Sequence, residues 1–428
     1  MNIQAQPTPR LYTPRIPSWA AGASFWRDFV GNPNLNPPGA AGGPITFTRA
    51  SAATRINAAC LFETLGPDVP AFDFDPLTGL CDGFRVEGAR TNIVYQSANP
   101  GASSGHENMI FESGPDGYKL IPTANPSLQH WARIGNMPTA IGTIYTCSIW
   151  VKAAEYQFAQ FTLSSGFAPD FWLTVNLATG QPSYVSPGLS VYRIKREGEF
   201  WRISITASAN AVSATGSIIV VPLPVSYTNR LPLYATDGVS GIVFSRSQME
   251  AGAFPSSYIP TAGAAATRAA DISILDSSAF AAAYAQNEGT VFVEWMLPLN
   301  TGGNQTILDF DGSSGGNRWQ IHRNSGSNDI RLYTAVSPNS REIRIGGLLD
   351  GAIARNALAW SGGRANWNYA TNGVTGTTTA TAQVDPLNKM RIGTGYNGTE
   401  ASYGYIRRLA LYPHALTAAQ LSALTTIT

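Results

Sequence analysis

The sequence predicts an all-β protein with an N-terminal extended arm and a small β collar, followed by two β-sandwich or jelly-roll domains. Glycine (42) and proline (28) are abundant, and they occur together with 18 Phe, 17 Tyr and 10 Trp. This balance is typical of tight turns that join aromatic-rich strands. Short segments in which apolar and polar residues alternate recur along the chain, as in residues 143–152. Since 428 residues exceed what one hydrophobic core serves, two or three domains are expected.

Charge and hydropathy exclude several classes of protein. Charged residues make up only 13% of the chain and nearly cancel to +1, so no basic surface for nucleic acid is expected. No run of about 18 apolar residues is present, so no membrane insertion is expected. The first residues also lack the charged start and apolar run of a secretory signal. Cys60, Cys81 and Cys147 are odd in number and lack CxxC spacing, which predicts free thiols and folding in a reducing cytoplasm.

Residues 1–45 differ from the rest of the chain. Their many prolines interrupt any long helix or strand. Trp19, Phe25, Trp26 and Phe29 are nevertheless too apolar for a solvated linker. Two interpretations stand equal at this point: an extended arm whose aromatic residues dock on another protein, or a segment that packs on the chain's own first domain.

Residues 46–95 are expected to form the collar from short strands and turns. The run 75–79 (DPLTG) is a turn, since Asp and Pro begin it and Gly supplies a positive φ. Phe72 and Phe74 alternate with Asp73 and Asp75, as on a half-buried strand.

Two larger β-domains follow, over residues 96–270 and residues 271–428. The strands expected in the first are 143–152, 158–163, 171–177, 191–195, 201–207, 217–221 and 241–249. Those expected in the second are 290–296, 306–310, 318–323, 330–335, 341–345, 356–360, 366–371, 389–393 and 403–412.

Two short helices are expected in the second domain. One covers residues 279–285, with Asp276, Ser277 or Ser278 as its cap, and the other lies at residues 416–421, with Thr417 as its cap.

Several motifs resemble a known family. Residues 47–51 (FTRAS), 72–79 (FDFDPLTG) and 87–92 (EGARTN) resemble a segment that recurs in tail-fibre and head-spike proteins of tailed bacteriophages. Residues 148–152, 198–203 and 249–261 are similar to the carbohydrate-binding-module-like jelly rolls of such proteins. Residues 289–295, 391–393 and 406–416 are similar to concanavalin A-like or laminin-G-like sandwiches. Residues 266–271 (ATRAAD) also echo residues 47–51, although two short matches are poor support for a repeat.

The resemblance implies a spike or fibre protein on the surface of a virion or phage-like particle, made in the bacterial cytoplasm and released by lysis. Residues 1–45 would then be the attachment arm that binds other virion proteins. The implied partner is a host capsular or other surface polysaccharide, bound without catalysis by a homo-oligomer, either a trimer or, at a capsid vertex, a pentamer. Two alternatives stay open: a purely structural head or tail decoration protein, and a glycan depolymerase.

Sugars are bound by exposed aromatic rings together with hydrogen-bonding side chains, and binding loops commonly gather at one end of a sandwich. Trp319 lies beside Arg318, Gln320 and His322. Trp150 and Trp201 have apolar neighbours and are expected in the core. The candidate carbohydrate-binding residues are Trp319, Trp360, Trp367, Tyr396 and Asn397 in the last domain, and Trp131 and Trp172 in the one before it.

Cofactors and catalytic groups are not expected, with calcium as the one weak candidate. Asp309 and Asp311 resemble the start of a calcium site, but an ordinary Asp-Gly turn explains them better. Paired carboxylates for glycan hydrolysis would have to come from Glu294, Asp309, Asp311 and Asp329. Two GxSxG matches, at 101–105 and 312–316, lack the strand and helix that flank a catalytic serine, and the four histidines show no metal spacing.

Overall fold

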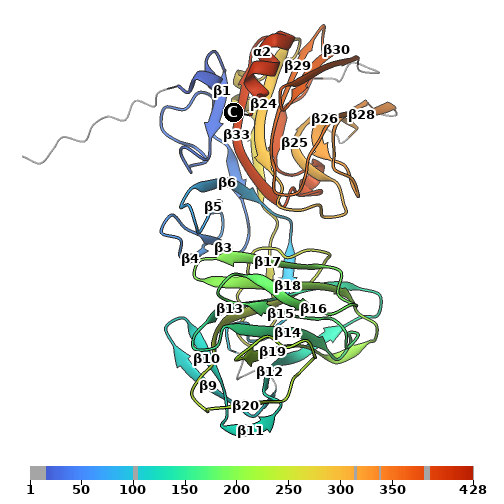
Figure 1. The fold of residues 1–428 in the computed structure, drawn as a ribbon. Helices are drawn as coiled ribbons and strands as arrows, with labels where there is room; N and C mark the ends of the chain where they lie inside the picture. Colours follow the sequence, from blue (N-terminus) through green and yellow to red (C-terminus); the bar gives the residue numbers. More distant parts are fainter. Residues whose placement is uncertain (1–15, 100–104, 313–315, 337–338, 380–385, 428) are drawn as a thin grey trace, which may run out of the picture. The chain divides into compact units, whose positions relative to one another are not determined.

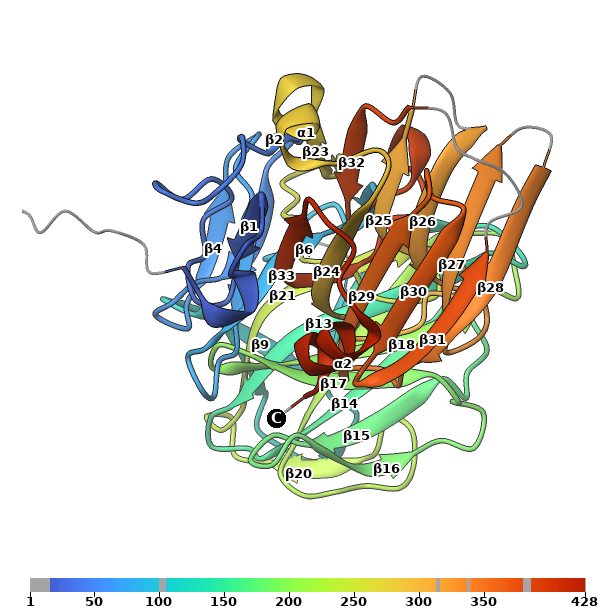
Figure 2. The same cartoon turned by 90° about the horizontal axis from the view of Figure 1, so that it is seen from above.

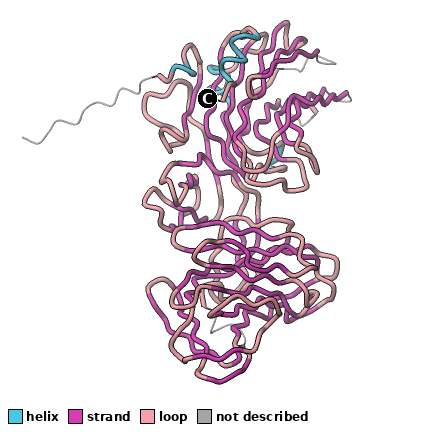
Figure 3. The backbone as a smooth tube through the Cα atoms, in the orientation of Figure 1, coloured by secondary structure: helices cyan, strands magenta, loops and turns pink. Residues whose placement is uncertain are grey.

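The computed structural model describes residues 16–99, 105–312, 316–336, 339–379 and 386–427. Strands make up nearly all of the regular structure in these ranges, and helices are short (Figures 1 and 3). The all-β fold class is therefore confirmed. The chain forms two compact units. The central unit comprises Thr48–Asp82 and Glu87–Asp271, and the C-terminal unit comprises the chain up to Phe47, Gly83–Val86 and Ile272–Thr428.

The central unit is built on two six-stranded antiparallel sheets. In order across the first sheet, the strands are β17 (Tyr192–Glu197), β18 (Phe200–Ser208), β13 (Ile144–Ala153), β21 (Ile242–Ala251), β10 (Gly117–Pro122) and β9 (Met109–Gly114). Across the second they are β16 (Gln181–Val185), β15 (Trp172–Asn176), β14 (Phe158–Ser164), β19 (Ser213–Leu223), β12 (Trp131–Thr139) and β8 (His106–Glu107). The shorter strands are β11 (Asn125–Leu128) with β20 (Tyr234–Thr236), β7 (Arg90–Asn92) with β22 (Ala266–Arg268), β3 (Ala53–Ile56) with β4 (Phe62–Leu65), and β5 (Ala71–Phe74).

The alternation in β13 explains how this unit packs. Ile149 points into the core between the sheets, where it joins residues such as Phe161 of the second sheet. Trp150 points to the opposite face and is buried there as well, against a cluster that includes Phe62 of the β3–β4 hairpin. The guanidinium of Arg246 lies 3.7 Å from the centre of the Phe62 ring. The hairpin, part of the expected collar, thus covers one outer face of the first sheet.

The C-terminal unit is a sandwich of two further antiparallel sheets (Figure 2). In order across the first, the strands are β31 (Val374–Thr379), β30 (Asn366–Thr371), β29 (Ile353–Ser361), β24 (Gly289–Met296), β33 (Gly404–Tyr412) and β6 (Cys81–Val86), with β1 (Phe25–Asp28) also paired to β33. Across the second they are β2 (Thr46–Thr48), β23 (Ile272–Asp276), β32 (Lys389–Ile392), β25 (Gln305–Asp311), β26 (Asn317–Arg323), β27 (Asp329–Val336) and β28 (Asn339–Gly347).

The expectation of an extended arm over residues 1–45 is wrong for residues 16–45. Phe25 in β1 pairs with Leu411 of β33, and Phe25 and Phe29 are fully buried. The ring of Trp19 lies 5.6 Å from that of Phe292 in β24. The aromatic residues of this segment therefore complete the core of the C-terminal sandwich, because burying them there removes a large apolar area from water. Residues 1–15 lie outside the described residues.

Both expected helices are present, with shifted bounds. Helix α1 (Ser277–Ala283) begins after Asp276, whose side chain makes no capping hydrogen bond. Helix α2 (Ala418–Thr425) is longer than predicted, and Thr417 caps it. The Thr417 hydroxyl accepts the Gln420 N–H, while the Gln420 side chain accepts the Thr417 N–H, which makes a capping box.

The signature motifs of the sequence meet in a buried ion cluster within the central unit. Arg49 Nη1 lies 3.2 Å from Asp271 Oδ1, and Arg268 Nη2 lies 2.5 Å from Asp271 Oδ2. Glu87 Oε2 lies 3.4 Å from Arg268 Nη2, and its backbone N–H donates to Asp271. The two echoing motifs thus supply one arginine each to a shared carboxylate.

Two other expectations concern thiols and membranes. Cys60, Cys81 and Cys147 are free, as predicted, and burial raises the pKa of the Cys147 thiol. Within the described ranges, none of the helices combines the length and apolar character of a membrane span.

Candidate functional site

Three of the predicted carbohydrate-binding tryptophans lie in the core of the C-terminal sandwich. Trp319 is fully buried, and Trp360 and Trp367 are each 1% exposed. The Trp319 ring stacks on Phe310 at 3.8 Å and meets Trp367 edge-on at 5.2 Å. A ring without an exposed face offers no platform to a sugar, so this prediction is wrong for all three residues.

In the central unit, Trp172 is also buried, at 6% exposure, because its ring stacks on Tyr184 at 4.8 Å. Its predicted role in binding is therefore wrong. Trp131 is half-buried, with the Arg133 guanidinium 5.8 Å from the ring centre. Trp131 stays a prediction.

Tyr396 and Asn397 lie in a short 3-10 turn, η2 (Tyr396–Gly398), between β32 and β33. Tyr396 is half-buried, and the Arg391 guanidinium lies 5.6 Å from its ring centre. Asn397 is exposed and has a φ of 60°. Both residues stay predictions, and Tyr396 lies next to the polar face of the second sheet.

Asp309 lies within β25 and Asp311 is the last residue of that strand, so the expected Asp-Gly turn would begin at Gly312 and falls largely outside the described residues. Both carboxylates are buried and face cations: Arg318 Nη1 lies 3.2 Å from Asp309 Oδ2, and Arg391 Nε lies 2.6 Å from Asp311 Oδ2. These guanidiniums compete with calcium for the same oxygens. Within the described part of the chain, no three His, Cys, Asp or Glu side chains are grouped to hold a metal ion.

The other two carboxylates considered for hydrolysis, Glu294 and Asp329, have arginine partners of their own. Glu294 lies on β24 of the other sheet, where burial opposes its ionisation but Arg408, Arg355 and Arg407 together lower its pKa. Asp329 pairs with Arg331 and Arg344. The two GxSxG matches fall largely outside the described residues.

Burial raises the pKa of Asp309 to about 7, while Arg318 acts to lower it and Asp311 to raise it further. Since an unfolded Asp ionises near pH ~3.9, the folded unit holds a proton between roughly pH 4 and 7 that the unfolded chain has released. The free energy that protonated Asp309 contributes to folding is fully present below about pH 4 and is lost as the pH rises to about 7.

We therefore expect the free energy of unfolding of the wild type to fall, between pH 4 and 7, relative to that of Asp309→Asn. The asparagine mimics the neutral acid and removes the titration. Denaturant unfolding of both proteins across this range measures the difference. Parallel pH profiles for the two proteins would contradict the expectation.

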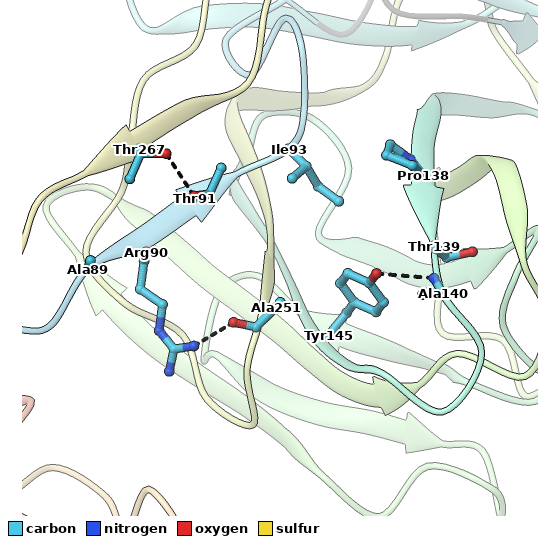
Figure 4. Close-up of a pocket in the computed structure, with 10 residues that line it drawn as sticks. All are labelled: Ala89, Arg90, Thr91, Ile93, Pro138, Thr139, Ala140, Tyr145, Ala251 and Thr267. Atoms are coloured by element: carbon cyan, nitrogen blue, oxygen red, sulfur yellow. Dashed lines mark hydrogen bonds between the residues drawn. The ribbon is translucent and has the colours of Figure 1, made fainter. Parts of the chain in front are cut away.

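A groove of about 510 Å³ opens on the central unit, between the β7–β22 ribbon and the strands β12, β13 and β21 (Figure 4). Its volume falls within the range of roughly 300–1,000 Å³ that small-molecule sites occupy. The residues that line it are Ala89, Arg90, Thr91, Ile93, Pro138, Thr139, Ala140, Tyr145, Ala251 and Thr267.

Hydrogen bonds within the lining fix its polar groups in place. Arg90 Nη1 donates to the carbonyl oxygen of Ala251 (Figure 4). The Arg90 guanidinium also lies 4.4 Å from the ring centre of Phe254. The hydroxyls of Thr91 and Thr267 lie 2.8 Å apart across the β7–β22 ribbon. The backbone N–H of Ala140 donates to the Tyr145 hydroxyl.

The backbone at Gly252 allows Arg90 to occupy this position. Gly252 has a φ of 141°, and a Cβ there would lie 2.1 Å from Arg90 Nη1. Glycine adopts this backbone conformation readily, and it leaves the room that the guanidinium fills. The position of Arg90 thus depends on a residue without a side chain.

The chemistry of the groove suits hydrogen bonding to a polar ligand. Its described lining supplies hydroxyls, one guanidinium, one aromatic ring and apolar patches, but no carboxylate, imidazole or thiol. Hydroxyls and guanidinium groups hydrogen-bond to a polar ligand, and Ile93 and Pro138 present apolar surface.

Sequence reasoning missed this site. Arg90 and Thr267 belong to the motifs at 87–92 and 266–271, but those motifs were interpreted as structural. The pairing of Thr91 with Thr267 joins residues 176 positions apart in sequence, and no local pattern predicts it.

No family model and no curated protein matches the chain. Similar solved structures include the Ruminococcus gnavus IT-sialidase CBM40, with a TM-score of 0.31 and 15% identity over 36% of this chain and 92% of that chain. The NanB sialidase from Streptococcus pneumoniae has a TM-score of 0.30 and 13% identity over 35% and 26%. A heptameric SAP-like pentraxin from Limulus polyphemus has a TM-score of 0.25 and 16% identity over 32% and 68%. Likenesses this weak carry no conclusion about the ligand or activity of this chain.

Proposed function

We propose that this protein is a non-catalytic glycan-binding protein, and that the groove of the central unit holds a short segment of a bacterial surface polysaccharide. The groove carries the proposal, because it combines ligand-sized volume with fixed hydroxyls, a guanidinium and apolar surface. A sugar presents both hydroxyl groups and apolar ring faces, and the lining complements both. The absence of carboxylate, imidazole and thiol groups from its described lining supports binding without cleavage.

The proposed setting is the surface of a tailed-phage virion or a phage-derived particle, where the protein serves as a spike or fibre. The motifs at 47–51, 72–79 and 87–92 support this setting through their resemblance to phage fibre and spike proteins. A homo-oligomer, trimeric or pentameric, would raise avidity by orders of magnitude without new contacts. The aromatic residues of the segment 16–45 pack in the C-terminal sandwich, so they are not available for docking on other virion proteins. Copurification of the protein with intact particles tests this setting.

Filling the groove should weaken the binding of the glycan that the groove holds. Thr267 is exposed on β22, so Thr267→Trp places a large ring in the groove without disturbing the core. Thr267→Val keeps the shape and removes only the hydroxyl. We expect the tryptophan variant to weaken binding at least roughly tenfold, and the valine variant to weaken it less.

A glycan array that includes host capsular oligosaccharides would identify the ligand, and titration calorimetry would then compare the variants. Thr228→Trp is the matched control, because Thr228 is exposed in the same unit and does not line the groove. Full binding by Thr267→Trp would exclude the groove. The absence of any bound glycan would favour a structural decoration protein, and release of reducing ends would favour a depolymerase.

A further inference from the structure

A row of side chains crosses the second sheet of the C-terminal unit. The register of five neighbouring strands places Arg391, Asp309, Gln320, Tyr333 and Glu342 directly opposite one another in turn. Directly opposed residues in antiparallel strands lie on the same face of a sheet. Phe310 and Trp319, the sequence neighbours of this row, point into the core. The row therefore occupies the outer face.

Two tyrosine rings flank the buried part of this row. The Arg318 guanidinium lies 5.2 Å from the Tyr333 ring centre on one side, and the Arg391 guanidinium lies 5.6 Å from the Tyr396 ring centre on the other. Both tyrosines are half-buried, and their exposed parts face solvent. Three strand spacings of about 4.8 Å separate β32 from β27, so the positions of Arg391 and Tyr333 lie roughly 14 Å apart. That span exceeds a single sugar ring.

The floor between the tyrosines holds acceptor atoms without a donor. Asp309 and Asp311 are fully buried, and Gln320 is 2% exposed. Asp309 Oδ1 and Gln320 Oε1 have no hydrogen-bond partner, while Asp311 Oδ1 faces the Lys389 ammonium at 3.8 Å. Buried polar atoms are nearly always paired in folded proteins, so two unpaired acceptors on one face indicate donors from outside the chain.

The floor carries both signs of charge, and this restricts the chemistry of the ligand. Asp309 pairs with Arg318, and Asp311 pairs with Arg391 and, at 3.8 Å, with Lys389. An acidic ligand would meet two buried carboxylates, and a cation would meet two guanidiniums, both at an electrostatic cost. A neutral molecule that donates several hydroxyl hydrogens meets neither penalty.

We propose that this row is a second binding site, separate from the groove, and that it takes a neutral, hydroxyl-rich oligosaccharide. Tyr333 and Tyr396 supply ring faces for stacking, and Arg318 donates hydrogen bonds at the surface. Asp309 and Gln320 supply acceptors from the floor. Asp311 acts as a positioning residue, because it fixes Arg391 beneath Tyr396.

The test titrates the full-length protein at pH 8 with two sets of oligosaccharides of matched length. One set is neutral, made of gluco- and galacto-oligosaccharides, and the other is a set of oligouronates. We expect the neutral set to bind and the acidic set not to bind to this face. Tyr333→Ala and Tyr396→Ala should each weaken neutral binding roughly tenfold, while Tyr333→Phe, which keeps the ring, should retain most of it.

Two controls make the result decisive. Tyr369→Ala removes a half-buried tyrosine of β30 in the other sheet, and Thr267→Trp fills the groove of the central unit. Both should leave neutral binding to the row unchanged. The proposal is overturned if no neutral oligosaccharide binds, if Tyr333→Phe loses as much affinity as Tyr333→Ala, or if Thr267→Trp abolishes all binding. The last outcome would leave the groove as the site and would support the proposed function alone.

Discussion

Replacement of Asp271 by alanine should lower the free energy of unfolding of the central unit by about 3–5 kcal/mol. Asp271 is 1% exposed at its side chain and contacts both Arg49 and Arg268, which are 0% and 1% exposed. Its removal leaves two buried guanidiniums facing each other without the carboxylate between them. Loss of one partner from a buried ion pair costs far more than the pair contributes, because the remaining charge stays desolvated.

Differential scanning calorimetry of the full chain measures this effect. For a unit of this size each kcal/mol corresponds to about 2–4 °C, so the transition of the central unit should move down by roughly 6–20 °C. Asp116→Ala is the control, since exposed Asp116 makes a surface ion pair with Lys152. Such pairs contribute about 0–1 kcal/mol. A shift for Asp271→Ala no larger than that of Asp116→Ala would refute the assignment.

This cluster gives the signature motifs of the sequence a physical explanation. Arg49 also donates to the carbonyl oxygens of Ser51, Gly66 and Val69, and Arg268 donates to that of Gly88. The arginines thus tie distant backbone segments to one carboxylate. The sequence showed the motifs and their echo, but the contact that joins them spans 222 positions.

The fold class was predictable because it depends on local patterns. Alternation and turn residues indicated the strands of both sandwiches, and Thr417 indicated the cap of the last helix. The outcome for residues 16–45 depended instead on the pairing of Phe25 with Leu411 near the other end of the sequence. The aromatic residues of this segment indicated that it packs on a protein surface, but they did not indicate which strand it pairs with.

The proposed site of the C-terminal unit includes the predicted Tyr396, whereas the predicted Trp319, Trp360 and Trp367 lie in the core. In β25 both Asp309 and the adjacent Phe310 are fully buried. The alternation of side chains along a strand shows that these two residues lie on opposite faces, but it does not reveal which face meets the core. Tryptophan suggested the sugar platform, yet Trp319 points inward and its neighbours Arg318 and Gln320 point outward. Only the facing sheet, with Trp360 and Trp367, decides this orientation.

Replacement of Trp319 by alanine should therefore destabilise the C-terminal unit by about 3–5 kcal/mol, the usual cost of removing a large buried aromatic side chain. Phe310 would lose its stacking partner, Trp367 its edge contact, and Tyr284 the hydrogen bond from the Trp319 indole. Calorimetry should show a lower transition for this unit. Val374→Ala, at a residue 73% exposed on β31, should leave that transition almost unchanged.

Because β26 and β27 present opposite faces at Trp319 and Tyr333, the two substitutions separate stability from recognition. Tyr333→Ala removes a half-buried ring from the outer face, so it should reduce neutral-sugar binding while the transition temperature falls far less than in Trp319→Ala. If Trp319→Ala instead kept the transition temperature and lost binding in the folded state, Trp319 would have to reach the ligand, and the inward orientation of its ring would be wrong. The register of this sheet places Trp319 and Tyr333 on opposite faces. We therefore expect the fold to depend on Trp319 and the proposed ligand site to depend on Tyr333.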